Sequence, residues 1–85
     1  MHTVTVAVGS SIGLHARPAA VISEAVIAAG TPITLALGDG EPVPADSALM
    51  IMTLGATQGT EVVVAGEDRA AVDRIAELVA QDLDA

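Results

Sequence analysis

A short segment at residues 13–20, GLHARPAA, brings a histidine, an arginine and a proline together. Pro18 predicts the first turn of a helix, because the N–H that proline lacks would be unpaired there in any case. His15 then falls in the cap region, where Ser, Thr, Asp and Asn are the usual residues. Without such a cap, backbone N–H groups at the helix start stay open to an anion. Arg17 adds a bidentate donor suited to phosphate oxygens.

The imidazole of His15 is a nucleophile in this setting. A neutral histidine is available near physiological pH, so it can accept and release a phosphoryl group. The spacing fits a second interpretation equally well, in which an exposed histidine lies beside a solvated arginine and the two share no function. From the residues alone, both interpretations stay open.

Composition excludes several classes of protein. The chain has 11 Asp and Glu against 3 Lys and Arg, a net charge of −8, and none of its cations is Lys. It therefore lacks the basic face that nucleic acids and anionic membrane surfaces require. The sequence has no Cys and no aromatic residue, so disulfides are excluded and the core must be aliphatic. We expect one cytoplasmic domain over residues 1–85, a monomer with no signal peptide and no membrane insertion.

Apolar periodicity and turn residues predict the elements that must position this segment. Strands are expected at residues 3–8, at 33–37, at 41–45 and around 62–64, and helices at 18–29, 47–54 and 67–83. The strand at 41–45 should be short and at an edge, because two prolines cannot donate to a ladder. The order βαββαβα predicts an α/β (α+β) fold, with one layer of sheet and one of helices.

Helical spacing gives finer expectations. The outer face of the first helix should carry Ala20, Ser23, Glu24 and Ile27, and Leu83 should end the apolar stripe of the last helix. Arg69 is expected to pair with Asp73, four residues further on. His2 has no evident partner in the sequence and is interpreted as incidental.

The segment GLHARPAA resembles the signature of HPr, the histidine-containing phosphocarrier family of the bacterial sugar phosphotransferase system. Residues 47–54 resemble the second, serine-centred motif of that family, and TLGATQGT at 53–60 resembles the stretch that follows it. The similarity covers essentially the whole chain. It implies the open-faced β-sandwich of the family, a four-stranded antiparallel sheet with three helices on one face.

The resemblance also implies an activity. His15 would take a phosphoryl group on Nδ1 from enzyme I, which phosphoenolpyruvate charges, and pass it to enzyme IIA domains during sugar uptake. The phosphate would be held at Ala16, Arg17 and Pro18, with Arg17 acting beside His15 in the transfer. No metal and no cofactor is implied, and the carrier has no turnover of its own, so its standing as an enzyme is left undecided. A nitrogen-regulatory or fructose-branch member would share the signature.

Ser47 is a second candidate site. Its simplest role is the N-cap of a short helix. The resemblance implies regulatory phosphorylation by a dedicated kinase, with removal by a phosphorylase, and a purely regulatory module acting through Ser47 is the alternative function. Asp46 stands where relatives commonly have a Lys, and its charge opposes a phosphate.

The expected partner-binding surface also departs from the family, whose members often carry Lys there. Here it consists of Ala20, Glu24, Ile27, Leu49 and Met50, which we call the docking face. An exposed apolar patch of this kind usually marks an interaction site. Binding of partners should therefore depend less on salt than in Lys-rich relatives. The acidic residues Asp39, Glu41 and Asp46 are interpreted as solvated turn residues and not as a calcium site.

Overall fold

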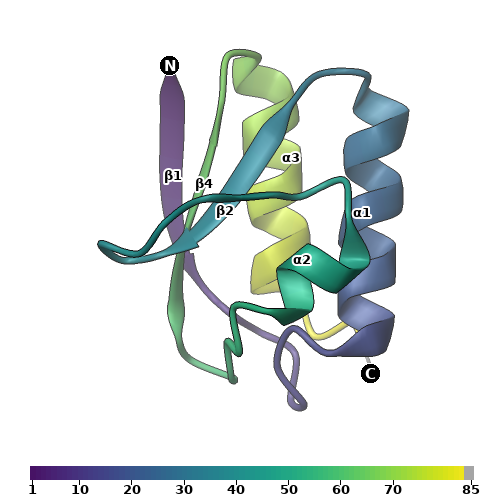
Figure 1. The fold of residues 1–85 in the computed structure, drawn as a ribbon, viewed down its shortest axis with the longest axis vertical. Coiled ribbons are helices and arrows are strands. Elements are labelled where there is room, and N and C mark those ends of the chain that lie inside the picture. Colours follow the sequence, from purple (N-terminus) through teal and green to yellow (C-terminus); the bar gives the residue numbers. More distant parts are fainter. Residues whose placement is uncertain (84–85) are drawn as a thin grey trace.

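The computed structural model describes residues 1–83 and shows seven elements along the chain. They are β1 (His2–Ala7), α1 (Ala16–Ala29), β2 (Ile33–Leu37), β3 (Val43–Pro44), α2 (Ala48–Met52), β4 (Glu61–Gly66) and α3 (Arg69–Ala80). The predicted order βαββαβα is confirmed. The helices lie to one side of the sheet, with α1 and α3 side by side and α2 across the lower part of α1 (Figure 1).

The sheet is fully antiparallel and has the strand order β1-β4-β2-β3. β4 therefore lies between β1 and β2, and every residue of β1 faces a residue of β4 in an unbroken register. β3 is at an edge, as predicted, but it spans two residues instead of the expected 41–45. Pro42 and Pro44 flank and end it, and a proline has no N–H to give to a ladder.

The core lies between the inner face of the sheet and the helices. Its largest fully buried aliphatic side chains come from both the sheet and the helices: Ile22, Leu35, Ile51, Val62, Val64, Val72, Ile75 and Val79. Val62 and Val64 point inward from β4 because side chains alternate along a strand, which is the periodicity that predicts this strand.

Helix α1 begins two residues earlier than predicted, at Ala16, so that Pro18 is its third residue. It ends at Ala29, as the predicted range 18–29 has it, and Gly30 forms the C-cap with φ 72° and an N–H that donates to the Ile27 carbonyl. Ser23 was expected on the outer face, and this is wrong: it is 7% exposed and its Oγ donates to the Ala20 carbonyl at 3.1 Å. The helix packs against both α2 and α3, which widens its buried stripe beyond one row of residues.

Two further helix boundaries differ from the prediction. α2 ends at Met52 and not near residue 54, because Thr53 forms its C-cap. α3 ends at Ala80, so Leu83 lies beyond the helix, although it still packs against the core. No helix within residues 1–83 is long and apolar enough to cross a membrane.

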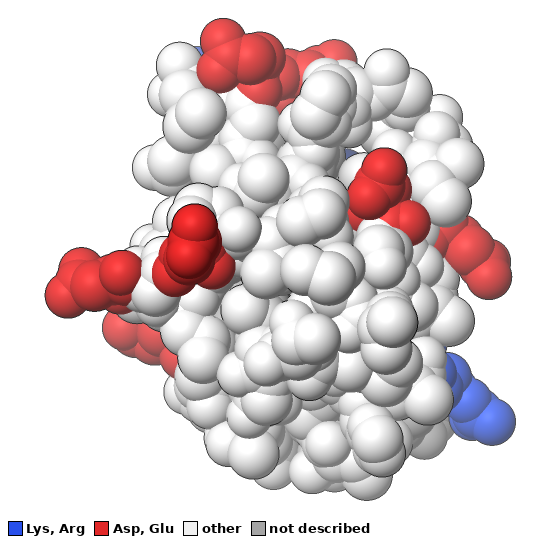
Figure 2. Space-filling model, in the orientation of Figure 1, with Lys and Arg blue, Asp and Glu red and all other residues white. Residues whose placement is uncertain are grey.

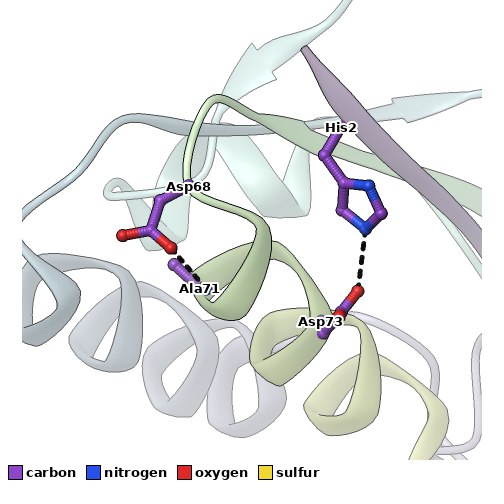
Figure 3. Close-up of polar contacts among 4 residues, drawn as sticks. All are labelled: His2, Asp68, Ala71 and Asp73. Atoms are coloured by element: carbon purple, nitrogen blue, oxygen red, sulfur yellow. Dashed lines mark hydrogen bonds and ion pairs between the residues drawn. The ribbon is translucent and has the colours of Figure 1, made fainter.

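A contact between β1 and α3 replaces the ion pair predicted within α3. Nε2 of His2 lies 2.9 Å from Oδ1 of Asp73 (Figure 3), so His2 has a partner after all. Among the described residues no ion pair joins Arg69 to Asp73. Asp68 accepts from the Ala71 N–H at 3.2 Å and caps the helix, so α3 begins at Arg69, two residues after the predicted start at 67.

Candidate functional site

The loop between β1 and α1 is held to the far end of the chain. The Gly9 N–H donates to the Val79 carbonyl at 3.0 Å, and a Cβ on Gly9 would collide with the backbone of Ala80. Ser10 is fully buried, and its Oγ donates to the Gln81 carbonyl at 3.4 Å and accepts from the Leu83 N–H at 3.2 Å. The start of the loop is therefore fixed by the residues around the end of α3.

The end of the loop is fixed by a second set of contacts. Gly13 has φ 78°, a conformation that favours glycine, and its N–H donates to the Ser10 carbonyl at 2.9 Å. The Leu14 N–H donates to the Ala56 carbonyl at 2.9 Å, and the Leu14 side chain is buried. Because Leu14 is tied to the segment before β4 and sunk in the core, the backbone of His15 has a defined position.

His15 is the N-cap residue of α1, and its side chain does not act as a cap. Its backbone is extended, with φ −91° and ψ −165°, and its carbonyl accepts the first helical hydrogen bond from Ala19 at 2.9 Å. The imidazole makes no capping hydrogen bond and is exposed. It is therefore free to react with a group that arrives from solvent.

The N–H groups of Ala16 and Arg17 are open as well. Among the described residues, no carbonyl or side chain accepts from either of them, and both residues are exposed. Pro18 supplies no donor and its ring is fully buried, so it packs the start of the helix, and its place in the predicted phosphate-binding set stays a prediction. Two open donors and the positive end of a 14-residue helix then face solvent beside His15.

Arg17 is the cation nearest in sequence to this helix start. It is exposed and forms no ion pair within the described chain, whereas Arg69 and Arg74 both lie in α3. Its guanidinium is therefore not committed to a carboxylate. An unpaired arginine next to open N–H groups is suited to a dianionic phosphate.

Ser47 caps α2, as predicted for its structural role. Its Oγ accepts from the Met50 N–H at 3.3 Å, and the residue is half-buried. Asp46 beside it is exposed. The hydroxyl is thus engaged in a helix cap on an accessible part of the surface.

The docking face combines α1 and α2, which pack against each other. Ile27 is 64% exposed and Leu49 is 69% exposed, while Glu24 and Met50 are also exposed and Ala20 is half-buried. The lower central part of the surface in Figure 2, where α2 lies in Figure 1, carries no charged side chains. The predicted apolar character of this surface is therefore present.

Two features of this surface were not identified from the sequence. Ile12, in the loop before His15, is 56% exposed, so an apolar side chain also stands on the loop side of the site. A groove of about 320 Å³ opens beside Ile27, between the end of α1 and the β2–β3 edge, and Asp46 lies on its wall. An isoleucine between Ser11 and Gly13, outside both the predicted strand at 3–8 and the predicted helix at 18–29, is the one signal that could have pointed to Ile12.

Comparisons with known proteins agree on one family. The model described as "PTS HPr component phosphorylation site" matches residues 2–81. The phosphocarrier protein HPr of Streptomyces coelicolor is 46% identical over 80 residues, which cover 91% of this chain and 86% of that protein.

No group of three or more His, Asp or Glu side chains in residues 1–83 could hold a metal ion.

Solved structures give the same answer for the fold. HPr-C-His from Thermoanaerobacter tengcongensis superposes with a TM-score of 0.87 at 30% identity, covering 100% of this chain and 98% of that one. Phosphocarrier protein HPr from Bacillus anthracis gives a TM-score of 0.79 at 30% identity, covering 92% and 95%. With the fold, the family model and a close relative in agreement, the chain belongs to the HPr family, the histidine-phosphorylated phosphocarriers of the phosphotransferase system.

Proposed function

We propose that His15 is the residue that carries the phosphoryl group, and that Arg17 and the N–H groups of Ala16 and Arg17 hold it. The observation that supports this most strongly is the uncapped start of α1. His15 occupies the cap position without using its side chain there, so the imidazole and the two N–H groups are available together. His2, the other histidine of the chain, lies in β1, and its Nε2 is hydrogen-bonded to Asp73 of α3.

The transfer exchanges one P–N bond for another. The lone pair on Nδ1 of neutral His15 attacks the phosphorus of a phosphohistidine on enzyme I, and the donor nitrogen keeps the electron pair of the bond that breaks. In the second step a histidine of enzyme IIA attacks the same phosphorus, and His15 leaves in the same way. The group stays at the oxidation level of phosphate, so neither step needs a redox partner.

Stabilisation in this mechanism comes from charge neutralisation and positioning. Phosphoryl transfer asks little covalent chemistry of the protein, and most of the catalysis comes from placing the reactants in line and balancing the charge on the oxygens. The N–H groups of Ala16 and Arg17 are aimed at that charge by the helix itself. The contacts of Ser10 and Leu14 fix the two ends of the loop, and so hold His15 in a constant position relative to these N–H groups.

Membership of the HPr family implies enzyme I and enzyme IIA as partners in general. We assign their binding to the docking face, because its exposed Ile27 and Leu49 are the kind of apolar surface that a partner covers. The same face would serve donor and acceptor in turn. We place the chain in the sugar branch; a fructose or nitrogen-regulatory member would accept phosphate from that branch's own donor instead.

The assignment of His15 is tested by incubating the protein with phosphoenolpyruvate and a catalytic amount of enzyme I, followed by mass spectrometry of the intact protein. We expect one acid-labile phosphoryl adduct, which His15→Ala abolishes and the matched variant His2→Ala retains. Circular dichroism of each variant shows that it is folded. An undiminished adduct on folded His15→Ala would overturn the assignment.

A second function, regulation through phosphorylation of Ser47, is supported by the position of this residue. It is half-buried next to the exposed Leu49 and Met50, so a phosphate there would add charge within the docking face. The exposed carboxylate of Asp46 opposes that phosphate. An acid-stable adduct formed with ATP and a serine kinase, lost in Ser47→Ala, is the result that supports this function.

A further inference from the structure

Strand β1 is the outermost strand of the sheet, and half of its backbone groups have no partner strand. The Val8 N–H donates to the Thr60 carbonyl at 2.9 Å, and the Val8 carbonyl accepts from Gly59, so both groups of Val8 point toward β4. In an antiparallel ladder this direction alternates along the strand. The N–H and C=O groups of Thr3, Thr5 and Ala7 therefore point away from β4, toward the free edge.

This edge lacks the usual protection against pairing. Natural edge strands carry Lys or Pro, or a bulge, or they are very short. β1 is six residues long, has the sequence HTVTVA, and keeps an unbroken register with β4. The opposite edge, β3, is by contrast two residues long and ends in Pro44.

A groove runs between this edge and α3. It has a volume of about 270 Å³, and its walls are the side chains of Val4 and Val6 from the strand and Ala76 and Ala80 from the helix. The small alanines leave the space open, because a larger residue there would reach across to β1. The hydrogen bond from His2 to Asp73 spans from strand to helix beside it (Figure 3).

The helix side of this groove is acidic. Asp73 and Glu77 also line it and are exposed, and Glu77 has no ion-pair partner within the described chain. An occupant that adds to β1 must therefore be extended, with apolar side chains facing the groove and a cation that reaches Glu77. A second copy of this chain fits poorly, since each copy carries a charge of −8 and would bring its own carboxylates to the contact.

We propose that the free edge of β1 and the groove beside α3 bind an extended basic segment of a partner protein, which joins the sheet as an additional strand. Main-chain hydrogen bonds to Thr3, Thr5 and Ala7 supply affinity, and the groove with Glu77 selects the side chains. In Figure 1, β1 lies on the left and α1 at the far right, with α3 between them, so such a partner leaves the docking face on α1 and α2 uncovered. The site can thus be occupied while phosphate is exchanged at His15.

The test uses a synthetic peptide, acetyl-Thr-Val-Thr-Lys-Thr-Val-Thr-amide, titrated into the ¹⁵N-labelled protein. We expect saturable shifts along β1 and α3, and slower amide hydrogen exchange at Thr3, Thr5 and Ala7. A matched peptide with Glu in place of Lys should bind more weakly. Absence of exchange protection at these three amides, or equal binding of the two peptides, would overturn the proposal.

Charge reversal on the protein gives an independent check. Glu77→Lys should weaken binding of the lysine peptide by about threefold to tenfold, in keeping with an exposed ion pair lost and replaced by repulsion. Asp39→Lys, the same charge change in the β2–β3 turn, should leave it unaltered. Equal effects of the two variants would contradict a role for Glu77. Concentration-dependent dimerisation that competes with the peptide would show instead that a second copy occupies the edge.

Discussion

Gly13 and Gly30 offer a matched pair of substitutions that separates the anchoring of the loop from general backbone strain. Both glycines have positive φ, 78° and 72° respectively. A Cβ on Gly30 would have nothing within 4 Å, whereas one on Gly13 would collide with the Ala56 carbonyl and approach Cα of Thr57 to 3.0 Å. Alanine at either position is strained, but only at Gly13 must the neighbouring backbone move.

The expected magnitudes follow from these contacts. Left-handed backbone costs a residue with a Cβ about 1–2 kcal/mol, which sets the destabilisation expected for Gly30→Ala. Gly13→Ala carries the same strain, and the displaced loop also loses the hydrogen bond from Leu14 to Ala56, about 0.5–1.5 kcal/mol more. Partial exposure of Leu14 adds to this, so we expect a total of about 2–4 kcal/mol.

Two assays distinguish the variants. Urea unfolding is followed by far-ultraviolet circular dichroism, because the chain has no aromatic residue for fluorescence. The rate of phosphorylation by enzyme I is then measured under conditions in which both variants are folded. Gly13→Ala should slow it by about tenfold or more, since small displacements of a reacting group are costly, and Gly30→Ala should leave it unchanged. If the two variants are equally stable and equally fast, the anchoring of His15 through this loop is refuted.

Three further predictions concern the site and its surroundings. Arg17→Ala should slow phosphorylation by about tenfold to a hundredfold, the loss of one charge-assisted contact, whereas Arg74→Ala, with the same loss of charge, should not; equal rates would contradict the role of Arg17. Ser47→Asp should keep the cap of α2, and therefore the free energy of unfolding, yet weaken enzyme I binding measured by calorimetry. Ser47→Ala should remove the cap and lower the free energy of unfolding by about 0.5–2 kcal/mol, while leaving enzyme I binding unchanged. Binding of enzyme I should change little between low and moderate salt, because four of the five docking-face residues are apolar and only Glu24 carries a charge; a tenfold loss of affinity would show that charge dominates.

Local patterns predict much of this fold. The alternation in β1 and β4, the acidic cap of α3 and the stop at Gly30 are each properties of a few adjacent residues, and all appear in the structure. The errors occur where contacts with distant segments determine the burial of a residue or the length of a strand. Ser23 is buried because two other helices pack on α1. β3 pairs with β2 only at Val43 and Pro44, because its prolines have no N–H to donate to that strand.

The candidate site divides in the same way. Pro18 located the helix start and His15 its cap, which the structure places within two residues of the prediction. The contacts that hold the loop were not predictable, because Ser10 meets residues more than seventy positions away, with a sequence separation of 73 to Leu83. The partner of His2 was missed for the same reason, since it lies 71 residues along the chain. The residues adjacent in sequence to Ser10 and to His2 give no indication of these contacts.

The most direct test of the central claim identifies the phosphorylated atom. With ¹⁵N-labelled histidine, the imidazole nitrogens of His2 and His15 are resolved by NMR before and after treatment with phosphoenolpyruvate and enzyme I. We predict that phosphorylation changes the Nδ1 signal of His15 and introduces coupling to phosphorus there, while both nitrogens of His2 keep their shifts. Coupling to phosphorus on His2, or on neither histidine, would contradict the account.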